Sequence, residues 1–150
     1  MKAYKIRYIA IFLAIILLSQ IGIQIINNSI ADSVRSELAS IPCPDTTIVE
    51  DSIFVAGKTF GNGNGMQYTG VILVRSFENK KRLETYYRYY YPECDVELLK
   101  SSIFDDAFSL KEISDTECYY VITLTREIES GTIPDTLFYR IISGCDIRGH

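Results

Sequence analysis

The chain opens with a long apolar segment that ends where the first acidic residue appears. Residues 8–31 contain no charged side chain across 24 positions. As a helix this segment would be about 36 Å long, enough to cross a hydrocarbon core of about 30 Å. Lys2, Lys5 and Arg7 precede it, and the first acid is Asp32. This asymmetry predicts a single-pass protein of the plasma membrane with a cytoplasmic N-terminus and its C-terminal domain outside.

The same segment also has features of a removable signal peptide. Its purely apolar part, Tyr8 to Leu18, has the length of a signal-peptide core, and Ser29-Ile30-Ala31 offers small residues for cleavage. However, aliphatic residues continue beyond Ser19 as far as Ile26. We therefore favour a retained anchor in which Tyr8 to Ile26 contacts membrane lipid. A secreted protein cleaved near Ala31 is the alternative.

Helical spacing of apolar residues continues past the anchor. Ile30, Val34, Leu38 and Ile41 follow this spacing until prolines 42 and 44 stop it. We therefore expect a cytoplasmic terminus and transmembrane anchor at 1–31, a stalk and linker at 32–45, and an extracytoplasmic domain at 46–150.

The first part of the expected domain has the pattern of a β-hairpin. Residues 46–60 and 66–75 are rich in β-branched and aromatic residues, with glycines and asparagines between them. If residues 61–65 form the loop, the strands are antiparallel and opposite residues match in polarity. The expected pairs are Val55 with Val71, Ile53 with Leu73, and Asp51 with Arg75.

A helix is expected next. Ser76 is a suitable N-cap for a helix that begins at 77 or 78 and ends at Tyr91, because Pro92 follows. Its buried stripe should contain Leu83, Tyr86 or Tyr87, and Tyr90. One stripe cannot bury all five tyrosines between 86 and 91, so one or two should remain partly exposed.

The remaining pattern completes an α+β fold. Residues 117–126 and 136–142 have strand character, whereas 95–110 has no clear period and suggests a strand or an irregular crossing. The predicted order is ββα-x-ββ. It corresponds to an antiparallel sheet of four to five strands with one packed helix.

Four cysteines follow the apolar segment, where oxidising conditions permit disulfides. If the last two strands form a hairpin, Cys118 and Cys145 lie opposite one another, because their midpoint falls beside Gly131. That pairing leaves Cys43 with Cys94. Free thiols are the alternative to both pairings.

Charge and histidine content limit the possible chemistry. All 19 acids but only 12 of the 15 basic residues follow the apolar segment, which leaves that part with a net charge of −7. Such a balance argues against binding nucleic acid. The single histidine is His150 at the chain end, so no catalytic triad is expected. We also expect no metal and no cofactor.

The glycine-rich loop and the chain end are the candidate binding surface. Glycine and asparagine are typical of a tight hairpin loop, which needs no ligand, but they also suit a loop that contacts a partner at the edge of a sheet. The candidate residues for binding an envelope protein or glycan are Gly61, Asn62, Gly63, Asn64, Gly65, Gln67, Tyr68, Arg148 and His150.

Three features of the sequence together carry a resemblance. The anchor with its proline-rich segment, G-N-G-N-G-M-Q-Y at 61–68, and D-I-R-G-H at 146–150 together resemble a group of small bacterial membrane-anchored proteins of unknown function. The resemblance implies a class without an assigned activity.

Our leading hypothesis from the sequence is a non-catalytic domain, tethered to the membrane, that binds a protein partner or envelope component. An envelope hydrolase or transferase assisted by His150 is the second hypothesis. The third is a structural subunit that associates through its membrane helix, where Gln20 and Gln24 offer interhelical hydrogen bonds.

Overall fold

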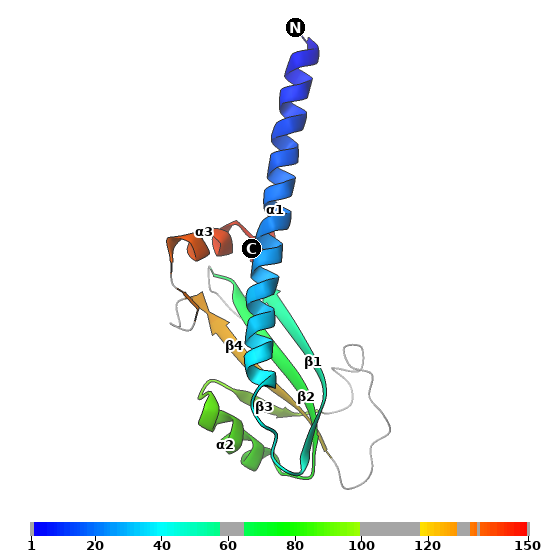
Figure 1. The fold of residues 1–150 in the computed structure, drawn as a ribbon, viewed down its shortest axis with the longest axis vertical. Helices are drawn as coiled ribbons and strands as arrows, with labels where there is room; N and C mark the ends of the chain where they lie inside the picture. The colour runs from blue at the N-terminus through cyan, green and yellow to red at the C-terminus, as the bar shows by residue number, and fades with distance from the viewer. Residues whose placement is uncertain (1, 58–64, 100–117, 129–132, 135, 150) are drawn as a thin grey trace.

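A long helix and a four-stranded antiparallel sheet form an α+β fold (Figure 1). The computed structural model describes residues 2–57, 65–99, 118–128, 133, 134 and 136–149. The strand order is β1-β2-β4-β3, with every neighbouring pair antiparallel, so the predicted fold class is confirmed. The elements are α1 (Lys2–Ala39), β1 (Thr47–Gly57), β2 (Gln67–Ser76), α2 (Lys80–Tyr90), β3 (Asp95–Leu98), β4 (Cys118–Glu127), α3 (Leu137–Cys145) and the 3₁₀ turn η2 (Ile147–Gly149).

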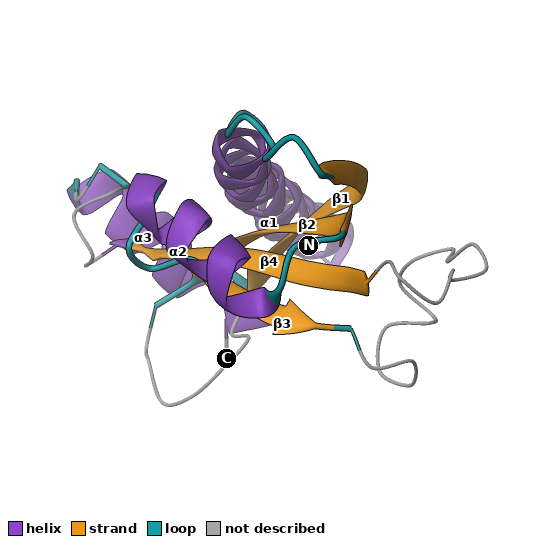
Figure 2. Ribbon diagram, turned by 90° about the horizontal axis from the view of Figure 1, so that it is seen from below, coloured by secondary structure: helices purple, strands orange, loops and turns teal. Residues whose placement is uncertain are grey.

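Helix α1 has two halves with different surroundings. Side chains 5–19 are all exposed, although most of them are apolar. From Asn27 onward, one face of the same helix is buried against the sheet, as Figures 1 and 2 show. Ala31, Val34 and Leu38 belong to the main core cluster and are at most 2% exposed. The residues expected to form a stalk are therefore part of the core of the domain.

Helix α1 approaches strand β2 very closely at Gly70. A Cβ atom placed on Gly70 would lie 2.5 Å from the Cα of Arg35 and 2.6 Å from its backbone nitrogen. Distances this short are incompatible with a side chain, so glycine is required for the helix to lie this near the strand.

Strands β1 and β2 form the predicted antiparallel hairpin, but its register differs by two residues. Ile53 pairs with Val71, and Asp51 pairs with Leu73. The connection runs from 58 to 66 and is centred one position earlier than the expected loop. A bulge between Val49 and Asp51 also shifts the pairing. Arg75 therefore lies opposite Ile48 and not opposite Asp51, and it forms an ion pair with Glu50 at 2.6 Å.

Helix α2 begins slightly later than expected. Asn79 is its N-cap and accepts a hydrogen bond from the Arg82 amide at 3.0 Å, whereas Ser76 accepts one from the Glu78 amide. Leu83 and Tyr87 are its buried residues. The expected exposed tyrosine is present, since Tyr89 is 84% exposed.

The prediction of a strand at 136–142 is wrong, because this segment starts helix α3. Its apolar run lacks the polar alternation that separates a strand from a buried helix. Thr136 is the N-cap and accepts a hydrogen bond from the Tyr139 amide at 3.4 Å. Ile142 and Ser143 form the buried side of the helix. The uncertain stretch from 95 contains the short strand β3, and its residues 100–110 lie outside the described part of the chain.

Candidate functional site

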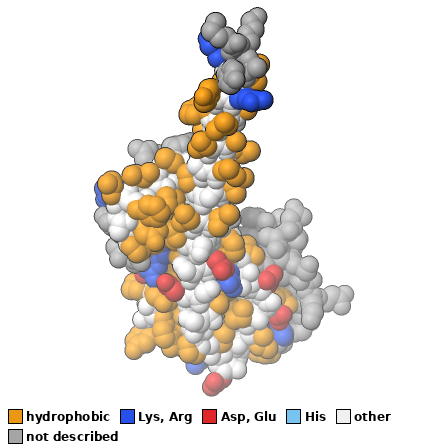
Figure 3. Space-filling view, turned by 45° about the horizontal axis from the view of Figure 1, so that its top comes forward, with side chains coloured by type: hydrophobic (Ala, Val, Ile, Leu, Met, Phe, Trp, Pro, Cys, Tyr) orange, Lys and Arg blue, Asp and Glu red, His pale blue; other side chains and the backbone are white. Residues whose placement is uncertain are grey.

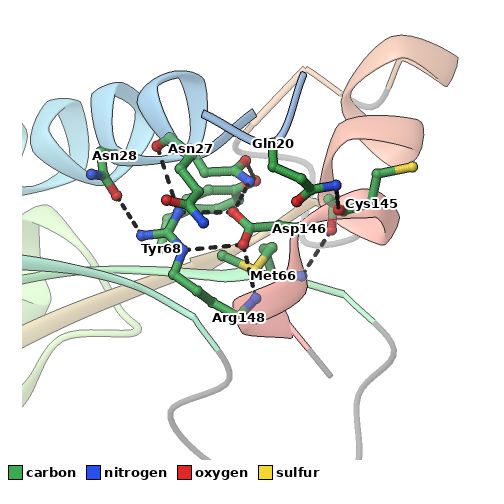
Figure 4. Close-up of polar contacts among 10 residues, drawn as sticks. Gln20, Asn27, Asn28, Met66, Tyr68, Cys145, Asp146 and Arg148 are labelled. Carbon is green, nitrogen blue, oxygen red and sulfur yellow. Dashed lines mark hydrogen bonds and ion pairs between the residues drawn. The ribbon is translucent and has the colours of Figure 1, made fainter. Parts of the chain in front are cut away.

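A buried polar cluster joins the end of the chain to helix α1 (Figure 4). Asp146 directly follows α3 and is fully buried. Its Oδ2 accepts a hydrogen bond from Asn27 Nδ2 at 2.6 Å. The Oδ1 of Asn27 in turn accepts one from the Tyr68 hydroxyl at 2.7 Å. Three buried polar side chains, from α1, β2 and the C-terminal segment, are thereby linked in one chain of hydrogen bonds.

Arg148 completes this polar cluster from the η2 turn. Its Nε donates to Asp146 Oδ1 at 3.1 Å, and its Nη2 donates to Oδ2 at 2.8 Å. This is a bidentate contact of the kind that makes arginine–carboxylate pairs strong. The Nη1 of Arg148 also donates to Asn28 Oδ1 on α1 at 2.8 Å. With its side chain 33% exposed, Arg148 covers the outer side of Asp146.

The surroundings of the polar cluster set its protonation. Burial alone would raise the pKa of Asp146, but hydrogen bonds from Arg148 and Asn27 outweigh this and lower the pKa to about 2. Burial, together with the nearby negative charge of Asp146, raises the pKa of Tyr68 to about 12. The carboxylate is thus ionised and fully engaged, and the phenol is neutral. This arrangement suits a structural link and not a general base, which needs a free lone pair facing a substrate.

Two further hydrogen bonds hold the C-terminal segment in place. The Gln20 side chain on α1 donates to the Cys145 carbonyl at 3.1 Å. The Met66 amide, just before β2, donates to Ser143 Oγ at 2.8 Å. The side-chain amide of Gln20, which the sequence suggested for contacts between helices, thus bonds within the same chain.

The structure brings together only some of the residues predicted for binding. Tyr68 and Arg148 lie in the polar cluster, and Gly65 lies close to Ser143. Gln67 donates to Glu127 of the neighbouring strand. Because Tyr68 is fully buried, it is unavailable to a ligand. Gly61, Asn62, Gly63, Asn64 and His150 lie outside the described residues.

Sequence reasoning did not single out Asn27. Its only signal is a pair of amides, Asn27 and Asn28, at the end of the apolar segment. Polar residues there are also typical of a helix that simply leaves the membrane. No sequence feature near Asn27 identifies Asp146, 119 positions away, as its hydrogen-bond partner.

The predicted disulfide between Cys118 and Cys145 is wrong. Cys118 starts β4 opposite Ser76, whereas Ser143 in the same helix as Cys145 contacts Met66 at the other end of β2. A ten-residue strand separates these ends by roughly 30 Å, and a disulfide requires Cα atoms within about 7 Å. The hairpin behind the prediction is absent because residues 137–145 are helical.

The other two cysteines lie near Tyr87. Cys43 Sγ is 4.0 Å from the Tyr87 hydroxyl. Cys94 is 1% exposed, and burial raises the pKa of its thiol to about 11. All four cysteines are free thiols in the structure, and pairing of Cys43 with Cys94 stays a prediction.

A second polar feature borders a cleft of about 220 Å³ between α1 and the segment that follows β4. Arg126 lines this cleft with its side chain 7% exposed, and its guanidinium lies 4.8 Å from the ring centre of Tyr91. Glu37 and Glu93 both form ion pairs with it. Because two carboxylates neutralise this one cation, the cleft is poorly suited to an anionic ligand.

Comparisons with protein-family models, curated proteins and solved structures found no match for this chain. Its function is therefore inferred from its own geometry.

Proposed function

We propose that this protein is a single-pass membrane protein, with its N-terminus in the cytoplasm, whose non-catalytic domain binds a protein partner just outside the bilayer. The observation that carries this proposal is the division of α1. One unbroken helix is long and apolar enough to cross a membrane, and its first half is exposed and apolar whereas one face of its second half is buried in the domain. An exposed aliphatic helix is unstable in water but suits lipid.

The packing of α1 also favours a retained anchor over a cleaved signal peptide. Cleavage after Ala31 would remove Asn27 and cut the helix at a residue that is fully buried. Tyr68 would lose its buried hydrogen-bond acceptor, and Asp146 would lose one donor. A processed chain would therefore lose part of its core, which a removable signal should not supply.

Strand β1 is the surface best suited to a protein partner. It is an edge strand of the described sheet and is 11 residues long. Its exposed apolar side chains are 37–55% accessible and include Ile48, Val49, Phe54 and Val55. An edge strand offers unpaired backbone groups to an extended segment of another chain, and the side chains next to it provide selectivity.

The proposed orientation is tested with the exposed thiol of Cys118, which lies in the domain at the start of β4. In a Cys43→Ser, Cys145→Ser background, which removes the other accessible thiols, a membrane-impermeant maleimide should label Cys118 in intact cells, and Cys118→Ser should remove that label. Labelling that appears only after the cells are permeabilised would place the domain in the cytoplasm and contradict the proposal.

Partner binding is tested by photo-crosslinking from β1 in native membranes. A photoreactive amino acid at Phe54 should give one discrete adduct, whereas the same amino acid at Phe77, which is 60% exposed and lies outside β1, should not. The adduct should disappear when Val55→Lys places a charge beside the crosslinking site. Equal adducts from both positions, or an adduct that is insensitive to Val55→Lys, would contradict binding at β1.

A further inference from the structure

Helix α3 has an apolar side that the described part of the protein leaves uncovered. Leu137, Phe138 and Ile141 are 75%, 58% and 55% exposed, and Ile147 in the next turn is 63% exposed. At 100° per residue, the three helical residues occupy one arc of about 100°, which is the width of an amphipathic face. The opposite side of α3 carries Ile142 and Ser143 and is buried.

This apolar side lies where α1 leaves the domain. Figure 1 shows α3 running across the direction of α1 about halfway along it. The hydrogen bond from Gln20 to the Cys145 carbonyl fixes the end of α3 at that level. In Figure 3, hydrophobic side chains cover both α3 and the adjoining upper part of α1. The two surfaces are therefore continuous with each other.

The length of the membrane-spanning part of α1 sets the depth of α3 relative to the bilayer. From Tyr8 to Ser19, where every side chain is exposed, the helix rises only about 18 Å, well short of a hydrocarbon core of about 30 Å. Ile21 and Ile25 are also exposed, at 47% and 62%. A span that extends to Ile25 is about 27 Å long and nearly matches the bilayer. With this span, Gln20 lies near the outer surface of the hydrocarbon core. Because Gln20 is bonded to the end of α3, α3 lies at the same depth.

We propose that α3 lies in the outer interface of the bilayer, with Leu137, Phe138, Ile141 and Ile147 inserted among the lipid acyl chains. The inference rests on the proposed function, since α1 must span the same membrane. A short segment with four exposed apolar side chains, three on α3 and one in η2, binds lipid weakly on its own. Here α1 holds it at the interface, so insertion has no separate cost of association. The domain is then fixed to the membrane at two points.

Single tryptophans test this proposal, because the chain contains no tryptophan. Three exposed phenylalanines are matched: Phe12 on α1, Phe138 on α3, and Phe77 at the far end of the sheet, which are 63%, 58% and 60% exposed. Each is replaced by tryptophan in the full chain, which is reconstituted in phosphatidylcholine vesicles with or without brominated acyl chains. Aqueous acrylamide is the opposing quencher.

Brominated lipid should quench Phe138→Trp several-fold more than Phe77→Trp, and acrylamide should show the reverse order.

Phe12→Trp reports on the anchor independently. If it is quenched by brominated lipid while Phe138→Trp remains open to acrylamide, α3 does not enter the interface although the anchor is sound. Shielding of Phe138→Trp from both quenchers would identify protein as the cover and also overturn the proposal. If Phe12→Trp is not quenched by brominated lipid, the membrane anchor itself fails, and insertion of α3 fails with it.

Discussion

Asn27 Nδ2 lies 2.6 Å from Asp146 Oδ2, although 119 positions separate the two residues. Asn27 belongs to the helix that begins as the apolar segment, and Asp146 lies between α3 and the η2 turn. Both side chains are fully buried. The contact therefore ties the proposed anchor, the sheet and the C-terminal segment into one cooperative unit.

Replacing Asn27 should destabilise the domain, because Asn27 is fully buried and links two other buried polar side chains. Asn27→Ala leaves the Tyr68 hydroxyl buried without its acceptor and removes one donor from a buried carboxylate. The expected loss is about 2–3 kcal/mol of unfolding free energy, measured by guanidinium unfolding of the full chain in detergent.

The neighbouring amide is the matched control for this change. Asn28 accepts one hydrogen bond from Arg148 at the surface, so Asn28→Ala should cost less than about 1 kcal/mol. Tyr68→Phe combined with Asn27→Ala should cost less than the sum of the two single changes, since both remove the same hydrogen bond. Equal effects at 27 and 28 would show that the buried chain of hydrogen bonds does not stabilise the fold.

The protein should lose stability in acid because of Asp146. The pKa of Asp146 is lowered from 3.8 to about 2 in the folded chain. The unfolded state therefore binds a proton first as the pH falls. The stabilisation from Asp146 is complete above about pH 4 and is lost as the pH falls through 2, a change of about 2 kcal/mol.

Asp146→Asn removes this titration. The variant should be less stable at neutral pH, and its unfolding free energy should fall less steeply than that of the wild type between pH 4 and pH 2. Parallel pH profiles for the two proteins would show that Asp146 has no lowered pKa in the folded chain.

Gly70→Ala should displace α1 from the sheet. The added methyl group would overlap the backbone at Arg35, which has no flexible end that can move aside. We expect a loss of about 3 kcal/mol or more, seen as a lower melting temperature. Gly57→Ala is the control, because a Cβ atom there meets no atom of the described residues within 4 Å and β1 should tolerate it. A Gly70→Ala protein as stable as Gly57→Ala would mean that α1 does not lie this close to β2.

Local patterns were sufficient to predict most of the sheet. The segments that form β1, β2 and β4 have strong β propensity, and a glycine lies at or near one end of each. Helix α2 was predictable because one amphipathic stripe precedes Pro92, although its N-cap is Asn79 and not the expected Ser76. The run that starts α3 was not, since its apolar residues occupy two sides of a helix, one packed against the domain and one exposed.

The polar cluster could not be predicted from the sequence, because its partners come from distant segments. Tyr68 and Arg148 were both selected as candidate residues, but as a binding surface. Tertiary packing turns Tyr68 inward toward Asn27 and lets Arg148 cover Asp146. The sequence pattern does not reveal that these positions are buried. Because they are buried, the polar cluster stabilises the fold and does not form a binding surface.

The central claim is that α1 is both a membrane anchor and a part of the core of the domain. The most direct test is the intact mass of the chain purified from the membranes of cells that produce it. We predict a mass that includes residues 8–31, and a protein that leaves the membrane only when detergent is added. A mature chain that begins at Asp32, folded and released without detergent, would contradict the claim.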